Sequence, residues 1–293
     1  MRPRIQPQEL PQSNLFPKIK RYLWGLGIGV AGIVLGYYLI TTYIFYYIPE
    51  ALPQYTIRKQ HTDDSLRIAF IGDSWADYHT LLGCDSMVKN VALSITDIPV
   101  KTATRGKKGA LSKEIYFFMY SNKTEEHSYE PDRCTQPLIE DAPDYCVVFA
   151  GINDVTFLRP TNFYTENMRY IISLLLHNKI RPVIMEIPIV NFSYPMPQFR
   201  FRERWFYRIR SLFMGTWNNE GSDYNNALRK MLSTSKLKDS VLYISANKWN
   251  PKGCLDTTIF LDDRLHLNLN GYHKLDSCIT TEIIRDYLKK KKL

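Results

Sequence analysis

The stretch that decides the fold is RIAFIGDSWADYH, residues 67–79. Its first half is a short apolar run that ends in Gly72, and residues 75–93 continue with spacing compatible with a helix. A buried strand, a tight turn and a helix are the natural interpretation of this pattern. In this interpretation Ser74 lies two residues after the strand, where the helix opens.

The same unit recurs along the chain. Four further runs have the composition of strands, and they are residues 98–103, 144–151, 181–190 and 241–245. Segments with helical spacing follow at residues 110–120, 162–177 and 271–290. Strands that alternate with helices predict an α/β domain with a parallel sheet covered on both faces, and ligands then collect at the carboxyl ends of the strands. Residues 191–222 are the expected insertion.

The N-terminal part is different in composition. Residues 22–49 contain no Asp, Glu, Lys, Arg or His, and this stretch exceeds the roughly 20 residues that a helix needs to cross a bilayer. A cleavable signal peptide has a shorter apolar region and a small-residue cleavage site, so we predict a transmembrane helix at 22–48. It would separate a tail, residues 1–21, from a linker, residues 49–66, and a domain, residues 67–293.

Charges next to this helix predict its orientation. The tail carries five basic residues, against three in the twenty residues after Glu50, so we expect the tail in the cytoplasm and the domain on the exported, periplasmic or extracellular, side of the cell membrane. Glycines spaced four apart within the helix, Gly25/Gly29 and Gly32/Gly36, would also allow two helices to approach closely. A homodimer through this helix is therefore a hypothesis.

Composition restricts the classes of partner. The 293 residues are 45% hydrophobic and 23% charged, as in globular proteins, and the formal net charge is +9. An exported domain rarely meets nucleic acid, so we expect no nucleic-acid partner and favour anionic glycans or lipid headgroups. The segment 198–210 alternates arginine with aromatic residues, which fits an acidic-glycan contact or lid, a solvated amphipathic helix, or a membrane-surface contact.

The five cysteines lack the CxxC or Cys/His spacing of zinc sites, and we expect no metal. In an exported domain a disulfide is feasible, but an odd number leaves at least one thiol unpaired or intermolecular. The cysteines are Cys84, Cys134, Cys146, Cys254 and Cys278.

Two segments hold candidates for a nucleophile and its base. Ser74 opens a helix whose free backbone N–H groups stabilise negative charge, although a serine is also a common helix cap. The segment DDRLHLNLNGYHKL, residues 262–275, places Asp263 three residues before His266, which supplies a base and a group that orients it, unless the two form a surface ion pair. The other histidines have no such setting and are expected on the surface or in packing; they are His61, His79, His127, His177 and His273.

Two further segments hold candidate donors to an oxyanion. Asn153 in FAGINDV follows a predicted strand, and its side-chain amide could donate to an oxyanion, although such a segment is also a turn signal. Gly109 in TRGKKGALS could present a backbone N–H without a side chain in the way, and Gly106 is the alternative.

The blocks stand in the order Ser, Gly, Asn, Asp-x-x-His, and with them residues 67–293 resemble the GDSL or SGNH hydrolase family. The resemblance implies the SGNH hydrolase fold, a flavodoxin-like three-layer α/β/α sandwich with a parallel sheet. It implies Ser74 as the nucleophile, His266 as the base and Asp263 as its orienting group. The oxyanion hole implied is the Ser74 N–H together with Gly109 and Asn153. Trp75 departs from the family pattern, which usually has an aliphatic residue there.

The reaction that this resemblance implies is acyl transfer from an ester, which requires no cofactor. We expect a serine esterase that removes acyl groups, in particular acetyl groups, from a carbohydrate or another ester at the cell envelope; the substrate would be a small molecule or a polysaccharide. Two alternatives stay open: an O-acyltransferase that acts on envelope polysaccharide, and a non-catalytic glycan-binding or assembly protein.

Overall fold

The computed structural model describes residues 15–46, 61–120, 135–157, 159–190, 201, 205 and 221–291. Contacts divide the chain into two compact units, Met1–Ile48 and Pro49–Leu293. The first unit is the helix α1 (Leu15–Tyr46), and its segment Ile19–Tyr37 has a mean hydropathy of 1.2. This segment is long and apolar enough to cross a membrane, as the sequence predicts, while the orientation of the helix stays a prediction.

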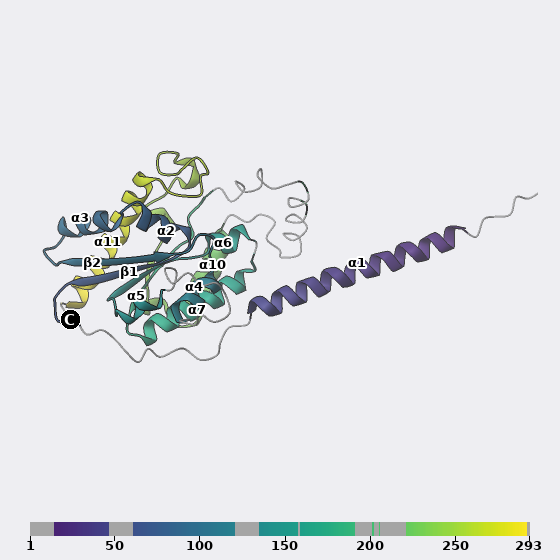
Figure 1. The fold of residues 1–293 in the computed structure, drawn as a ribbon, viewed down its shortest axis with the longest axis horizontal. Helices are drawn as coiled ribbons and strands as arrows, with labels where there is room; N and C mark the ends of the chain where they lie inside the picture. Colours follow the sequence, from purple (N-terminus) through teal and green to yellow (C-terminus); the bar gives the residue numbers. More distant parts are fainter. Residues whose placement is uncertain are drawn as a thin grey trace, which may run out of the picture. The chain divides into compact units, whose positions relative to one another are not determined.

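A parallel sheet of five strands forms the centre of the second unit, in the order β2-β1-β3-β4-β5 (Figure 1). All five strands lie in the runs predicted from the sequence, and their parallel arrangement is confirmed. The strands are β1 (Leu66–Gly72), β2 (Val100–Gly106), β3 (Tyr145–Phe149), β4 (Arg181–Met185) and β5 (Leu242–Ile244).

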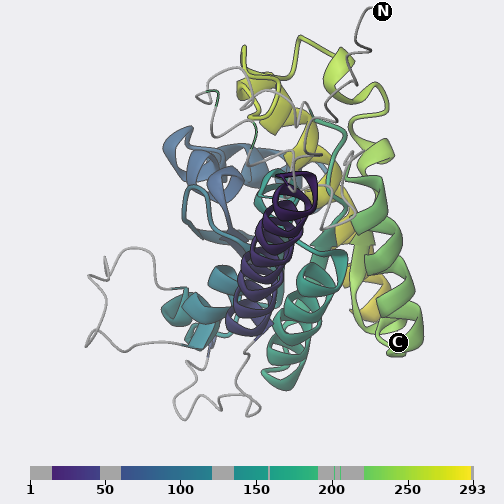
Figure 2. The same ribbon diagram turned by 90° about the vertical axis from the view of Figure 1, so that its right-hand side faces the viewer.

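Helices cover both faces of this sheet, which gives the predicted three layers (Figure 1). One layer consists of α2 (Ser74–Leu81), α3 (Asp85–Leu93) and α11 (Leu269–Lys291). The other consists of α4 (Ser112–Tyr120), α5 (Gln136–Glu140), α6 (Ile152–Thr156), α7 (Thr161–His177) and α10 (Ser222–Thr234). Within that layer α7 and α10 pack against each other (Figure 2). Three 3-10 turns complete the described elements, and they are Lys238–Ser240, Ala246–Lys248 and Gly253–Leu255.

Three predicted boundaries are wrong, and one of them is the end of the strand expected over 181–190, which stops at Met185. The helix expected over 75–93 is broken in two, because Gly83 has a φ of +65°, a left-handed conformation that ends a helix. The second strand lies at Val100–Gly106 rather than at 98–103, because Pro99 has no N–H to donate to a sheet.

Some sequence predictions lie outside the described residues. Of the arginine-rich segment 198–210 only Phe201 and Trp205 are described, and both side chains are exposed. Cys134 is not described either. The other four cysteines have free thiols, so no disulfide joins the cysteines that the structure describes.

Gly72 ends β1 at the point where the chain turns toward Ser74. Its φ is +153°, and a Cβ added there would lie 2.1 Å from the carbonyl oxygen of Phe149 on the neighbouring strand β3. Only glycine therefore allows β1 and β3 to approach each other at the sheet edge that carries the candidate site.

We expect Gly72→Ala to lower the free energy of unfolding by more than about 3 kcal/mol, because the added methyl group overlaps backbone that cannot move. Gly83→Ala is the matched control: it has a φ of +65° but nothing lies within 4 Å of its added Cβ, so only the conformational cost of about 1–2 kcal/mol remains. Urea unfolding of both variants measures the difference. Equal losses would contradict the role of the contact with Phe149.

Candidate active site

Ser74 is the first residue of α2 and is 6% exposed. The helix cap is Asp73, whose Oδ1 accepts a hydrogen bond of 2.9 Å from the backbone N–H of Trp75. Because Asp73 caps the helix, the alternative interpretation of Ser74 as the cap is wrong. The Ser74 hydroxyl makes a different contact.

The structure brings Ser74, His266 and Asp263 together, although Ser74 and His266 are 192 positions apart in the sequence. The Ser74 Oγ lies 3.0 Å from His266 Nε2, and His266 Nδ1 lies 2.6 Å from Asp263 Oδ2. The imidazole therefore contacts a hydroxyl on one side and a carboxylate on the other, which is the arrangement by which a base activates a serine.

Backbone contacts hold the carboxylate of Asp263 in place. Its Oδ1 accepts hydrogen bonds of 2.9 Å from the backbone N–H groups of Leu265 and His266. Burial alone would raise the pKa of Asp263, but these bonds and the His266 side chain hold the pKa below its ordinary value. Asp263 is therefore ionised at neutral pH and can accept the Nδ1 proton of His266.

The loop that carries His266 is tied to the start of α11. Phe260 and Leu267 form an antiparallel bridge, and the backbone N–H of Leu261 donates to the His266 carbonyl at 2.8 Å. The Asn268 side chain donates to the carbonyls of Thr258 and Phe260 and accepts from the N–H of Gly271. These contacts account for Asn268, the polar residue two positions after the histidine.

Two of the expected oxyanion donors lie in neighbouring positions. The Asn153 amide donates to the carbonyl of Ala110 at 3.0 Å, next to Gly109, and one amide proton remains for another acceptor. Gly109 is exposed and has a φ of +74°. Gly106, the alternative, has a packing role, because an added Cβ would lie 2.6 Å from the Asp73 carbonyl oxygen.

Asp154 is a residue of the site region that the sequence analysis did not single out. It is fully buried and accepts hydrogen bonds from Ser112, at 3.0 Å from the N–H and 2.8 Å from the hydroxyl, which joins α6 to the start of α4. Burial raises its pKa to about 7. The pKa of Asp73 is also raised to about 7, by burial and by the charge of Asp154. The signal in the sequence was that both acids follow neighbouring strands.

These two raised pKa values predict how stability depends on pH. In the unfolded chain the carboxyls titrate near 3.8, so between about pH 4 and pH 7 the folded protein holds protons that the unfolded chain has released. The stability that they contribute is complete below pH 4 and is lost as the pH rises through 7. We expect Asp154→Asn to make this decline shallower, as measured by urea unfolding at several pH values. A decline of unchanged slope would contradict this assignment.

Aromatic rings surround the candidate triad. The Tyr78 ring lies 5.0 Å from the His266 ring, and the Lys108 Nζ lies 4.8 Å from the Tyr78 ring centroid. On the other side Trp75 packs edge-on against Trp249, with 5.9 Å between ring centroids. Side chains that include Asp73, Trp75 and Trp249, but not Ser74 itself, line a cavity of about 20 Å³.

Comparison with known proteins identifies the family of the chain. A profile of the GDSL-like lipase/acylhydrolase family matches residues 68–279, and the chain belongs to this family. Family membership implies ester hydrolysis as the general activity. No curated protein sequence matches the chain.

Solved structures resemble this chain at low sequence identity. The lipase/acylhydrolase from Enterococcus faecalis is 17% identical, with a TM-score of 0.50 over 74% of this chain and 95% of that one. A GDSL-like lipase from Bacteroides thetaiotaomicron is 13% identical, with a TM-score of 0.48 over 75% of this chain and 88% of that one. An acetyl-xylooligosaccharide esterase from a Geobacillus species is 15% identical, with a TM-score of 0.48 over 75% and 95%. At these identities the likeness to the Enterococcus protein shows the fold alone.

Proposed function

We propose that this protein is a serine esterase in which Ser74 is the nucleophile, His266 the general base and Asp263 the group that orients the base. The observation that carries the proposal is the continuous contact from the Ser74 hydroxyl through the His266 ring to the Asp263 carboxylate. In this reaction Ser74 Oγ attacks the ester carbonyl while its proton moves to His266 Nε2. His266 then protonates the leaving alcohol, and a water molecule deprotonated by the same nitrogen releases the acid.

Backbone and amide donors would stabilise the oxyanion of the tetrahedral intermediate. The Ser74 N–H lies at the start of α2, where a helix leaves its N–H groups free. The free amide proton of Asn153 and the N–H of Gly109 are the other proposed donors, since the Ala110 carbonyl ties their segments together. Such donors contribute most where charge develops in the transition state.

A short acyl group, in particular acetyl, is the proposed substrate moiety. A cavity of about 20 Å³, lined by Asp73 and Trp75, the sequence neighbours of Ser74, has room for about one water-sized group, and the rings of Trp75 and Trp249 limit its size. A carbohydrate as the ester's other part is favoured by the position of Tyr78 beside His266, because an aromatic face can stack on a sugar ring. The apolar helix α1 would hold the enzyme at the cell envelope with its domain exported.

The proposal is tested with the full chain purified in detergent. We expect release of acetate from p-nitrophenyl acetate and from an acetylated oligosaccharide, and no release by Ser74→Ala. Equal release by the two proteins would refute the proposal. Transfer of acetyl from a donor to an oligosaccharide, without free acetate, would identify an O-acyltransferase instead. Glycan binding without either activity would identify a binding protein.

Topology needs a separate experiment on intact cells. Protease added outside the membrane that bears the protein should cut the large domain and leave α1 with the tail. Full protection of the domain would contradict the proposed orientation.

Trp75→Leu is expected to change the preference for acyl length, because it removes a ring that lines the proposed acyl cavity. The ratio of kcat/KM for butyrate over acetate esters should rise by roughly 10-fold or more, which corresponds to added room for one or two methylenes. A ratio that stays at the parent value would show that Trp75 does not limit the acyl group. Thermal unfolding checks that the variant remains folded, since Trp75 also packs on Trp249.

A further inference from the structure

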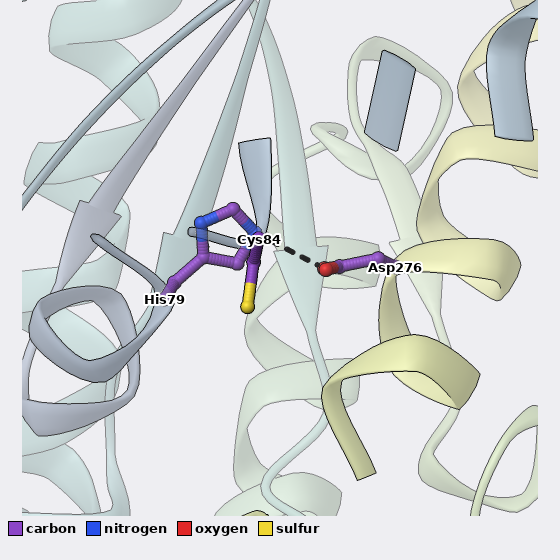
Figure 3. A group of neighbouring side chains, drawn as sticks. All are labelled: His79, Cys84 and Asp276. Atoms are coloured by element: carbon purple, nitrogen blue, oxygen red, sulfur yellow. Dashed lines mark hydrogen bonds and ion pairs between the residues drawn. The ribbon is translucent and has the colours of Figure 1, made fainter. Parts of the chain in front are cut away.

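A second group of reactive side chains lies outside the candidate active site. His79 of α2, Cys84 directly before α3 and Asp276 of α11 meet in the interior, and all three are 0% exposed (Figure 3). One ligand atom from each lies within 4.8 Å of the others. The shortest separation joins His79 Nε2 to Asp276 Oδ1, at 3.2 Å.

One polar atom of this cluster lacks a hydrogen-bond partner among the described residues. Asp276 Oδ2 is buried and has no hydrogen-bond partner among the residues that the structure describes, and Figure 3 shows the Asp276 side chain directed at His79. A buried carboxylate oxygen without a partner costs free energy.

We propose that His79, Cys84 and Asp276 bind a structural divalent metal ion of the zinc type. The Nε2 of His79, the Sγ of Cys84 and a carboxylate oxygen of Asp276 are three ligands of the kinds that zinc prefers, and the second Asp276 oxygen supplies a fourth donor. A thiolate and a carboxylate offset the two positive charges, so the buried site has no net charge. As the metal enters, any protons on the thiol and the carboxyl leave for solvent.

The surroundings of His79 fit this role. When Nε2 binds a metal, Nδ1 carries the ring proton and needs an acceptor. Thr104 Oγ1 lies 3.4 Å from Nδ1 and donates in turn to Asp85 Oδ1 at 3.2 Å. The relay ends on a carboxylate, which is the usual partner of a metal-binding histidine.

The separation between ligands also fits. Zinc bonds of about 2.0–2.2 Å to nitrogen and oxygen place two tetrahedral ligands about 3.3–3.6 Å apart. His79 Nε2 and Asp276 Oδ1 are 3.2 Å apart, so they need to separate by only a few tenths of an ångström. Because all three side chains are inaccessible to solvent, the metal would be taken up as the chain folds. It would join α2, which carries Ser74, to α3 and α11.

The metal content of the full chain, purified in detergent without a histidine tag, tests this proposal first. We expect one zinc ion per chain. Refolding with cobalt(II) in place of zinc should give a thiolate-to-metal charge-transfer band in the near ultraviolet. These measurements need no variant. Absence of bound metal after refolding with zinc, with no rise in Tm, would overturn the proposal in favour of a buried His79–Asp276 hydrogen bond.

Substitution of single cysteines tests whether Cys84 is a ligand of the metal ion. Cys84→Ala should fold, lack the charge-transfer band and retain at most about a tenth of the zinc. Cys146→Ala is the matched control, because Cys146 is equally buried but lies on β3 away from the cluster, and it should keep both. If Cys84→Ala fails to fold, the charge-transfer band of the parent chain decides the question. Equal zinc in both variants would overturn the assignment. The readouts do not depend on esterase activity, so this proposal and the proposed function can fail separately.

Discussion

Replacing Ser74 with Ala is expected to lower kcat for ester hydrolysis by roughly 10⁴-fold or more, because the variant has no hydroxyl to form the acyl-enzyme. His266→Ala should lose a comparable factor, since His266 is the base that contacts the Ser74 hydroxyl and is oriented by Asp263. The double variant should lose no more than either single variant, because groups that act as one unit are not additive. Steady-state kinetics with p-nitrophenyl acetate measures all three.

Ser86→Ala is the matched control, because Ser86 is an exposed serine of the next helix, α3, outside the site. It should retain the parent rate. If the losses of Ser74→Ala and His266→Ala simply multiply in the double variant, the two residues act independently and the account of one catalytic unit is wrong.

Asp263→Asn has the second largest expected effect, a fall in kcat of roughly 10³-fold with KM changed little. In this variant the side-chain oxygen can still accept the hydrogen bonds from the backbone N–H groups of Leu265 and His266. In that conformation the NH2 group faces His266 Nδ1 and donates a hydrogen bond to it. The ring is then driven to the tautomer that carries its proton on Nε2, which cannot accept the proton of Ser74.

Asp262→Asn serves as the control for Asp263→Asn, because the neighbouring carboxylate is exposed. It should leave kcat within about twofold, as is usual for surface changes. A rate close to the parent's in Asp263→Asn would mean that the 2.6 Å contact does not determine the state of the His266 ring.

Helix α11 joins the two halves of the site. The loop with His266 leads directly into it, and the Tyr272 hydroxyl donates to the Trp75 carbonyl at 2.8 Å. Asp276, a turn further on, contacts His79 at 3.2 Å. The helix that follows the base therefore also holds α2, the helix that begins with the nucleophile, and this positions two residues that are distant in the sequence.

The spacing of apolar residues was sufficient to predict the strands of the sheet. It did not predict the ends of elements where the conformation of a single residue overrides the pattern. Strand β3 is buried along its whole length and reads as a continuous apolar run, so its position was evident. The break at Gly83 was missed because helical spacing continues across it while a positive φ leaves no periodic signal. α10 was not predicted, although only its first residue, Ser222, falls in the segment that we expected to be an insertion.

The candidate triad was predictable because its residue types occur in an ordered set of motifs. Its surroundings were not, since they depend on contacts between distant segments. Asp154 and Tyr78 stand next to motif residues, yet only the folded chain shows that one is buried against Ser112 and the other lies beside His266. His79 was expected on the surface or in packing; the structure buries it, and the partner Asp276 is 197 positions away.

Covalent labelling tests the central claim most directly. A fluorophosphonate reacts with a serine hydroxyl only when a neighbouring base activates it, and mass spectrometry of the digested chain locates the adduct. The account predicts one adduct, on Ser74, that is lost in His266→Ala although this variant remains folded. An adduct on another residue, or labelling of Ser74 that persists at the parent rate in His266→Ala, would contradict it.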